Sequence, residues 1–387
     1  MTPRALLLES FAAALAAVDG RHAVASELKR HPLPGAWHVL AVGKAAGAMA
    51  QGAAAALGSR VAGGLAVLPP GYLPHDFDAA AHGIDLVYSS HPLPDERSLE
   101  AGAMVMEYVA RLPDDAALLC LVSGGASSLV EALVPGKTLD DLQSLNRWAL
   151  QSGAPIAEIN AARRQLSRLK GGGLALLAGE RRLQALMISD VPGDDPRVIG
   201  SGLLHGDATT REVPVRIVAS IAHACRAAAA AARDRGLRTR IVRTRLAGDA
   251  ARLGTRIASS LARQPPGVLQ VRGGESTVRL PENPGRGGRN QHLALAAAIE
   301  FERLQLQGAY LLAAGTDGID GASEDAGALV DAGTCLRARD AGCDAYQSLA
   351  RADSGTLLDA AGDLLHTGPT ATNVGDLVLT LKDGWQR

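Results

Sequence analysis

Short aliphatic runs alternate along the chain with Gly-, Ser- or Asp-containing turns and Ala-rich stretches. This alternation predicts βα units around a parallel sheet. The clearest units are a strand at 37–42 followed by a helix at 45–57, and a strand at 118–122 followed by a further helix. Further strands are expected at 183–188, 215–219 and 237–242. Each loop after a strand leaves the end at which open α/β sheets bind ligands.

A helical hairpin is expected at 139–152 and 155–170, with Pro155 in the first turn of its second helix and glycines 171–173 as a C-cap. The second helix carries a polar stripe opposite its apolar residues, made of Asn160, Arg163, Ser167 and Lys170. Such a stripe usually faces solvent, and we expect it to do so here.

A second α/β segment begins near Gly267. It is predicted to contain strands at 268–271 and 276–280, a Pro/Gly/Arg loop, a helix from about Asn290 and a strand at 310–314. The polar, arginine-rich stretch 247–266 is the candidate boundary before it. We therefore expect an α/β protein of two domains, 1–245 and 246–387.

Composition narrows the class of protein. The 387 residues contain 39 Lys and Arg against 40 Asp and Glu, so no basic surplus favours a nucleic-acid partner. Aromatic residues make up 3% of the chain, which predicts an aliphatic interior. The four cysteines form no C-x-x-C pair, which favours reduced thiols in a cytoplasmic protein. The apolar run near the N-terminus is too short for a signal peptide, and no stretch is long enough to cross a membrane.

Two of the turns after strands could hold anions. Lys44 stands at the start of a helix, where a cation opposes the helix dipole and a bound anion would remove the conflict. The alternative is a lysine whose charge reaches solvent. The turn 123–128, Ser-Gly-Gly-Ala-Ser-Ser, offers converging N–H groups and hydroxyls for phosphate or carboxylate. Its alternative is a plain helix start with Ser128 and Glu131 as a capping box.

Acidic and basic side chains mark the other strand ends. Asp190 and Asp194 fit a magnesium ion held by one or two carboxylates and by substrate phosphates, or are ordinary turn residues. Arg286 and Arg289 precede a helix in a glycine-rich loop, where guanidinium groups match phosphate or carboxylate. Asp317 follows another strand and could serve a metal, a hydroxyl or a base function, or form an Asp-Gly turn.

Two familiar nucleotide motifs are excluded. Gly136-Lys137-Thr138 imitates the end of a Walker A loop, but Glu131 stands where its first glycine is required. No G-x-G-x-x-G follows a predicted strand, which weakens a nicotinamide-dependent dehydrogenase.

In chain order these segments resemble the glycerate 2-kinase family, also known as the glycerate kinase type II or MOFRL family. The resemblance rests on ordered motifs that span nearly the whole chain: Val42-Gly43-Lys44-Ala45, His91-Pro92-Leu93-Pro94-Asp95, Ser123-Gly124-Gly125-Ala126-Ser127, Gly153-Ala154-Pro155-Ile156 with Glu158-Ile159-Asn160, Arg168-Leu169-Lys170-Gly171-Gly172, Ser189-Asp190-Val191 with Gly193-Asp194-Asp195, Gly273-Gly274-Glu275, Gly287-Gly288-Arg289-Asn290-Gln291, Thr316-Asp317-Gly318-Ile319-Asp320-Gly321, and Thr367-Gly368-Pro369-Thr370 with Thr372-Asn373-Val374. Ala371 departs from the pattern, because the family usually has glycine there.

The resemblance implies ATP-dependent phosphorylation of D-glycerate at its 2-hydroxyl, with magnesium as the metal. It also implies a Rossmann-like N-terminal domain with a mostly parallel sheet, a smaller mixed α/β MOFRL domain, and an active site in the cleft between them. Lys44 and Arg289 are carried over as catalytic and would neutralise the transferring phosphoryl group. Asp317 would bind the substrate hydroxyl, and Asp190 or Asp194 the metal. The expected substrate- and phosphate-binding residues are Ser123, Gly124, Gly125, Ser127, Asn160, Glu275, Arg286, Asn290, Thr370 and Asn373.

Other functions stay open at this stage. Relatives of the family have carried the label hydroxypyruvate reductase, an activity that needs NADH or NADPH. Phosphorylation of a related small hydroxy acid is another alternative, and a nucleotide- or phosphosugar-binding regulator is a third. The partners expected are small molecules, with no nucleic acid or membrane, and a homo-oligomer is one option for the assembly.

Overall fold

The computed structural model describes residues 1–152 and 156–384, which form two compact units. Unit 1 contains residues 1–17, 221–370 and 374–387, and unit 2 contains residues 18–220 and 371–373. In the described residues no helix has both the length and the apolar character needed to cross a bilayer. All four cysteines are free thiols.

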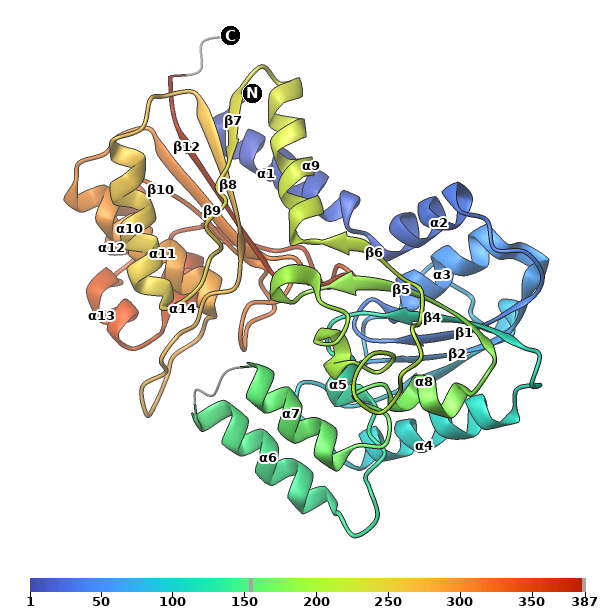
Figure 1. Cartoon of the computed structure of the whole chain (residues 1–387). Coiled ribbons are helices and arrows are strands. Elements are labelled where there is room, and N and C mark those ends of the chain that lie inside the picture. Colours follow the sequence, from blue (N-terminus) through green and yellow to red (C-terminus); the bar gives the residue numbers. More distant parts are fainter. Residues whose placement is uncertain (153–155, 385–387) are drawn as a thin grey trace. The chain divides into compact units, whose positions relative to one another are not determined.

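Unit 2 is a parallel sheet with helices on both faces (Figure 1). Its strands are β1 (Trp37–Val42), β2 (Val61–Leu68), β3 (Ile84–Tyr88), β4 (Ala117–Val122), β5 (Arg182–Ser189) and β6 (Val215–Ser220). They lie in the order β3-β2-β1-β4-β5-β6. This is the order typical of dinucleotide-binding folds.

Helices alternate with the strands of unit 2 along the chain. They are α2 (Gly20–Arg30), α3 (Ala46–Leu57), α4 (Glu96–Arg111), α5 (Ala126–Leu129), α6 (Leu139–Ser152), α7 (Ile156–Leu166) and α8 (Gly173–Ala178), with 3-10 turns at Gly58–Arg60, Ala80–His82, Pro192–Asp194 and Ile199–Ser201. Helices α2 and α3 cover one face, and α4, α5 and α8 cover the other (Figure 1). The central strand β4 is buried along its whole length, as an aliphatic run in a doubly covered sheet must be.

Unit 1 has a mixed sheet. Its strands are β7 (Arg238–Ile241), β8 (Val268–Gly274), β9 (Ala309–Gly315), β10 (Gly327–Asp331), β11 (Leu364–Leu365) and β12 (Asp376–Lys382), in the order β11-β10-β9-β12-β8-β7. Only the β7–β8 pair is parallel among these pairings in the described residues. The helices are α1 (Pro3–Ala17), α9 (Ile221–Asp234), α10 (Ala250–Ala262), α11 (Arg289–Arg303), α12 (Thr334–Asp340), α13 (Ala345–Ala350) and α14 (Ser354–Ala360).

The expected fold class is confirmed: one mostly parallel Rossmann-like sheet with flanking helices and a second, mixed α/β unit. The unit limits differ from the expected 245/246 boundary, because the compact units divide at Ser220/Ile221. The arginine-rich stretch 247–266 contains α10, which Asp249 caps by accepting from Arg252 N at 2.9 Å. Its arginines lie on a helix whose other face is buried, so the polar composition marked a helix surface.

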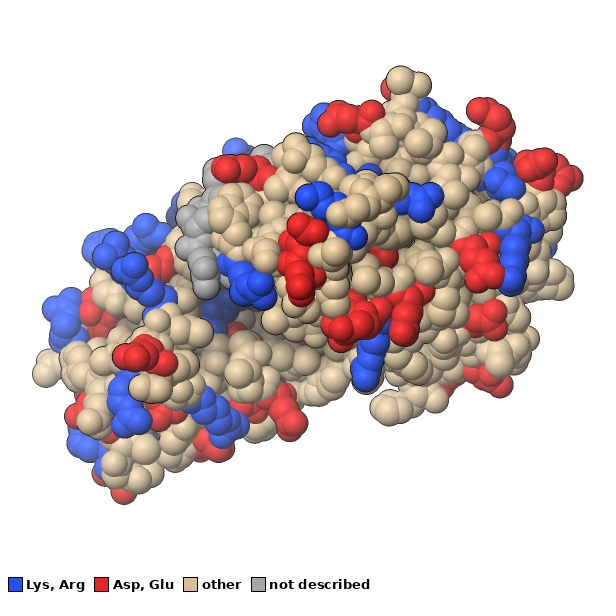
Figure 2. Space-filling model, turned by 90° about the horizontal axis from the view of Figure 1, so that it is seen from below, with Lys and Arg blue, Asp and Glu red and all other residues tan. Residues whose placement is uncertain are grey.

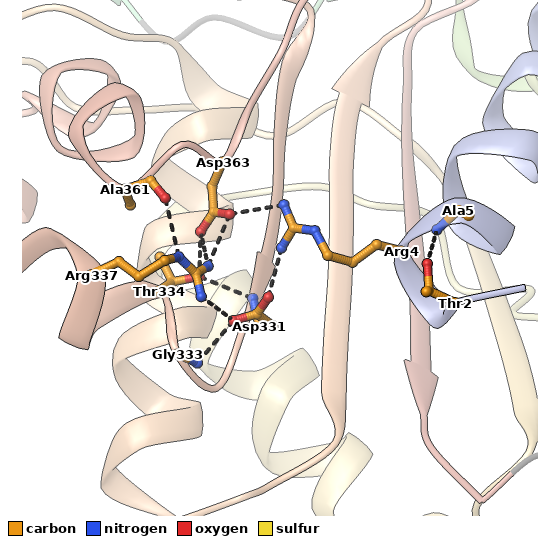
Figure 3. Close-up of polar contacts among 9 residues, drawn as sticks. All are labelled: Thr2, Arg4, Ala5, Asp331, Gly333, Thr334, Arg337, Ala361 and Asp363. Atoms are coloured by element: carbon orange, nitrogen blue, oxygen red, sulfur yellow. Dashed lines mark hydrogen bonds and ion pairs between the residues drawn. The ribbon is translucent and has the colours of Figure 1, made fainter.

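The N-terminal helix α1 belongs to unit 1 because it packs against elements of that unit and forms ion pairs with them. It packs on α9 and β12, and Arg4 bonds Asp331 at 2.6 Å and Asp363 at 2.8 Å. Figure 3 shows Arg4 reaching across the sheet to the two aspartates, which Arg337 contacts from the other side. Two guanidinium groups thus share two carboxylates.

Three local predictions need correction. The segment 276–280 is not a strand; it makes a single bridge, Thr277 to Asp249, and has no sheet neighbour along its length. Helix α7 ends at Leu166 rather than at 170, because the Ser167 hydroxyl accepts from Leu169 N and Lys170 N and turns the chain. The glycines that follow begin α8 instead of capping α7. Pro155, expected in the first turn, lies outside the described residues.

Charge on the surface is mixed, as the balanced composition predicts. On the face drawn in Figure 2, Lys and Arg lie among Asp and Glu rather than in one extended basic patch.

Candidate active site

The strand order of unit 2 reverses between β1 and β4, and open α/β sheets bind ligands at such a switch point. The turns after these two strands are hydrogen-bonded to each other. Lys44 N donates to Gly124 O at 2.9 Å, and Ala45 N donates to the Ser123 hydroxyl at 3.0 Å. Two turns predicted separately as anion sites therefore form one structure.

Glycine at 124 and 125 is required by close approach. A Cβ on Gly124 would lie 2.1 Å from Asp190 Oδ2 and 3.1 Å from Asn373 Nδ2. Gly125 has φ +86°, and a Cβ there would lie 3.3 Å from Lys44 Cγ. The missing side chains let a lysine, an aspartate and an asparagine from separate loops gather around one backbone turn.

A cavity of about 220 Å³ opens beside this turn. It is lined by His91, Pro92, Gly124, Gly125, Ser127, Ser128, Asn160, Arg163, Asp190, Val191, Val198, Gly200 and Ser201. The predicted residues Gly124, Gly125, Ser127, Asn160 and Asp190 are thus brought together, whereas Asp194 is not among the lining residues. We refer to this cavity as the switch-point pocket.

A chain of hydroxyl groups runs along the switch-point pocket. The Ser201 hydroxyl donates to Asn160 Oδ1 at 3.0 Å, and the oxygens of Ser127 and Ser201 are 2.8 Å apart. Because a hydroxyl has one proton and that of Ser201 goes to Asn160, Ser127 is the donor to Ser201. Ser127 is therefore left to act as an acceptor toward the pocket.

The polar stripe of α7 and the turn after it does not face solvent, so that expectation was wrong. Asn160, Ser167 and Lys170 are buried, and Arg163 lines the switch-point pocket. Lys170 forms a buried ion pair with Glu131, which also rules out the capping box proposed for Glu131. Burial lowers the pKa of Lys170, and Glu131 acts to raise it.

Lys44 is half-buried, and its Nζ lies 6.0 Å from the centre of the Tyr72 ring. That distance is at the limit of a cation–π contact. Metal ligands are sparse nearby: the described residues contain no group of three or more His, Cys, Asp or Glu that could hold an ion. Asp190 fits a magnesium ion that takes one carboxylate and otherwise binds water and phosphate.

Arg289 begins helix α11 in unit 1 and is held by carboxylates. Its Nε and Nη2 donate to Asp376 at 2.7 and 3.0 Å, and Nη1 lies 2.5 Å from Glu275. Burial acts to lower the pKa of Arg289, but these partners raise it above its usual value. The side chain of Asp376 is buried and that of Glu275 is half exposed, so Glu275 is the more replaceable partner.

The backbone at the start of α11 already binds an anion of the chain itself. Asp320 accepts from Asn290 N at 3.0 Å and from Gln291 N at 2.8 Å. Burial raises the pKa of Asp320 to about 7 despite these bonds. Asn290 is buried and also reaches Asp320 with its Nδ2 at 3.3 Å.

The remaining predicted residues of unit 1 lie in neighbouring loops. Arg286 is paired with Asp325 and Asp359, each at 2.9 Å, which ties the glycine-rich loop down. Asp317 accepts from Thr370 N through its backbone oxygen at 3.3 Å. A second cavity, of about 350 Å³, is lined by Val278, Leu280, Pro284, Gly285, Gly287, Gly288, Arg289, His292, Gly321, Ala322 and Ala352.

Sequence reasoning missed several residues around these sites. His91 and Ser201 line the switch-point pocket, and Asp376 holds Arg289. His91 stood in a quoted motif, so the sequence did carry a signal for it. Asp376 and Arg289 are 87 residues apart in the chain, so the local sequence carried no signal for their pairing.

Family models match both parts of the chain. Residues 6–233 match a domain of unknown function (DUF4147), and residues 268–376 match the MOFRL family. The two matches together cover most of the chain.

Relatives and a solved structure match nearly end to end. D-glycerate 2-kinase of Thermotoga maritima is 35% identical over 89% of this chain and 90% of its own. A protein of Agrobacterium vitis, named provisionally as a hydroxypyruvate reductase, is 37% identical over 97% of this chain and 94% of its own. The crystal structure of glycerate kinase from Thermotoga maritima superposes with a TM-score of 0.86 at 33% identity, covering 98% of this chain and 99% of that one.

Proposed function

The chain belongs to the glycerate 2-kinase family, with its DUF4147 and MOFRL parts, and from this premise we propose that it transfers a phosphoryl group from ATP to the 2-hydroxyl of D-glycerate. The observation that carries the proposal is the reversal of strand order beside the switch-point pocket, where the turn of Lys44, the glycine-rich turn and the carboxylate of Asp190 meet. Phosphoryl transfer needs charge stabilisation and alignment more than covalent chemistry.

In unit 2, Lys44 supplies positive charge to the transferring phosphoryl group. The N–H groups of the turn 123–127 hold phosphate or substrate oxygens, as glycine-rich helix starts do, and the Ser127 hydroxyl accepts from a substrate hydroxyl. Asn160 and Asn373 complete the polar wall on either side of this turn. The location we propose for such an enzyme is the cytoplasm, in keeping with its free thiols.

Magnesium is the metal we propose for the reaction. When bound with ATP it neutralises phosphate charge. Asp190 would supply the protein ligand, because it is the aspartate that lines the pocket. Asp194, which lies in a separate 3-10 turn and outside the pocket lining, is the weaker candidate.

In unit 1, Arg289 supplies a second positive charge through its Nη1, while Asp376 fixes the other side of the guanidinium. Glu275 would give way to phosphate at Nη1. Asp317 receives the proton of the substrate hydroxyl, with Thr370 ordering its loop. Arg286 and Asn290 act through the shape of the loop, since both are engaged with aspartates.

The cavity beside Arg289 suits the nucleoside of ATP. Its volume of about 350 Å³ and its lining of Val278, Leu280 and Pro284 are those of an apolar ligand pocket. We assign the adenine ring to this wall because a flat apolar base gains most from such a lining.

The kinetic test replaces each cation. Lys44→Ala and Arg289→Ala should each lower kcat for ADP formation by about 10²-fold or more, the usual loss when one charge-stabilising group is removed. Lys137→Ala, an exposed lysine on another loop, is the matched control and should keep the rate. Unchanged rates in both active-site variants would refute the assigned roles.

Hydroxypyruvate reduction is the second candidate, favoured by the dinucleotide-type strand order of unit 2. The turn after β1 reads Gly43-Lys44-Ala45-Ala46-Gly47, which lacks the glycine spacing of that cofactor's fingerprint. Following NADH and NADPH absorbance with hydroxypyruvate separates the two functions. A decrease in NADH or NADPH absorbance with hydroxypyruvate, without ATP-dependent turnover of D-glycerate, would refute the kinase proposal in favour of the reductase.

A further inference from the structure

Arg163 places a positive charge on the wall of the switch-point pocket, which also contains the carboxylate of Asp190. It lies on α7, and its Nη2 donates to Asn146 Oδ1 at 3.1 Å. Asn146 is itself buried and fixed through its Nδ2 to Leu142 O at 2.9 Å. The guanidinium is thus held by a rigid partner while it lines the pocket.

Arg163 shares its interacting carboxylate with a second cation. Glu131 is the carboxylate that acts on Arg163, and it already forms a buried ion pair with Lys170. The side chains of Glu131 and Lys170 are each 1% exposed. Arg163 and Lys170 therefore share Glu131, and a partly buried cation gains from a further anionic partner. An anion in the pocket beside Arg163 would be such a partner.

The size and lining of the pocket restrict which anion can bind there. Its volume of about 220 Å³ lies below the range of drug-sized ligand sites, so it suits a molecule of a few heavy atoms. Ser127, which donates to Ser201, presents an acceptor to a ligand hydroxyl. Asp190 repels a carboxylate, so the acid group of the ligand is directed away from it and toward Arg163.

We propose that Arg163 binds the carboxylate of the acid substrate and makes the switch-point pocket selective for small hydroxy acids. The inference rests on the proposed function, because it gives the acceptor of that reaction its recognition residue. A guanidinium matches a carboxylate with two parallel N–H bonds, which a neutral amide or an alcohol cannot accept in the same way.

The experiment compares D-glycerate with D-glyceramide, its neutral amide, in wild type, Arg163→Gln and Arg163→Lys. Arg163→Gln should raise KM for D-glycerate at least tenfold, the smaller end of what a hydrogen bond to a charged group is worth, and leave KM for ATP within about twofold. The preference for acid over amide should disappear. Arg163→Lys keeps the charge without the fork, so it should keep the preference with a several-fold higher KM.

The matched control is Arg147→Gln, which removes an exposed arginine of the same hairpin that bonds Ser144 on its own helix. It should behave as wild type. An unchanged KM and acid preference in Arg163→Gln would overturn the inference while the kinase function stands. Failure of wild type to phosphorylate D-glycerate would instead refute the proposed function, and calorimetric binding of D-glycerate to wild type and variant would then decide the role of Arg163. If Arg163→Gln does not fold, an unchanged KM in Arg163→Lys overturns the inference.

Discussion

Asp320 gives a prediction whose sign and size follow from its surroundings. Its carboxylate is buried beneath the start of α11, where burial raises its pKa from 3.8 to about 7. The N–H groups of Asn290 and Gln291 favour the charged form, but they do not offset the loss of water. Asp320→Asn keeps an oxygen for one of these donors, turns its amide nitrogen toward the other, and removes the titration.

The folded chain binds the Asp320 proton up to about pH 7, whereas the unfolded chain releases it near pH 4. Between these values the native state binds more protons, so stability falls as the pH rises. The full penalty is about 4 kcal/mol at 1.36 kcal/mol for each tenfold change in proton concentration. From pH 5 to pH 8 the linkage relation gives a loss of about 2–3 kcal/mol.

Urea unfolding of wild type and Asp320→Asn, followed by far-ultraviolet circular dichroism at pH 5, 6, 7 and 8, measures this loss. The free energy of unfolding of wild type should fall relative to the variant by about 2–3 kcal/mol over the series. High salt is the control: it should leave the difference nearly unchanged, because buried groups are screened little. Parallel pH profiles, or a relative gain for wild type, would refute the reasoning.

Three further changes test other parts of the structure. Lys170→Met should destabilise the protein by about 3–5 kcal/mol in urea by leaving the buried Glu131 unpaired, and adding Glu131→Gln should recover part of that loss. Gly124→Ala places a methyl 2.1 Å from Asp190 Oδ2, so D-glycerate turnover should fall by at least about tenfold while far-ultraviolet circular dichroism stays that of wild type. Arg4→Ala removes the ion pairs that anchor α1, and limited proteolysis should then cut the N-terminal helix faster than in wild type. Equal unfolding free energies, an unchanged turnover or equal cleavage rates, respectively, would contradict these expectations.

The local pattern predicted β1, β4, β5 and β6 of unit 2 nearly to the residue, whereas β2 and β3 were not predicted. A run such as Trp37–Val42 is continuous and aliphatic because helices cover both faces of its sheet, and the turn after it is marked by glycine. These signals lie within a few residues of one another, so the sequence carries them directly.

Unit limits depended on pairings between distant segments. Strand β7 belongs to unit 1 because it pairs in parallel with β8, and α1 belongs there because Arg4 reaches Asp331 and Asp363. Neither contact leaves a trace in the local pattern, since the partners are more than 300 residues apart in the second case. Topology rather than composition set this boundary.

In the candidate site, too, local features were predictable from the sequence, whereas contacts between distant residues were not. The turns with Lys44 and Ser123 were visible as glycine-rich strand ends, and the fold joined them. The polar face of α7 was misjudged because the partner that buries Lys170 is Glu131, 39 residues earlier. A polar stripe alone does not distinguish a solvated face from one that closes over a buried charge.

The product of the reaction tests the central claim most directly. Purified protein is incubated with ATP, Mg²⁺ and D-glycerate, and enolase is added without phosphoglycerate mutase. The account predicts ADP together with 2-phosphoglycerate, which enolase converts at once to phosphoenolpyruvate with a rise in absorbance. ADP formation without that rise, with 3-phosphoglycerate as the product, or no ATP-dependent turnover of D-glycerate at all, would contradict it.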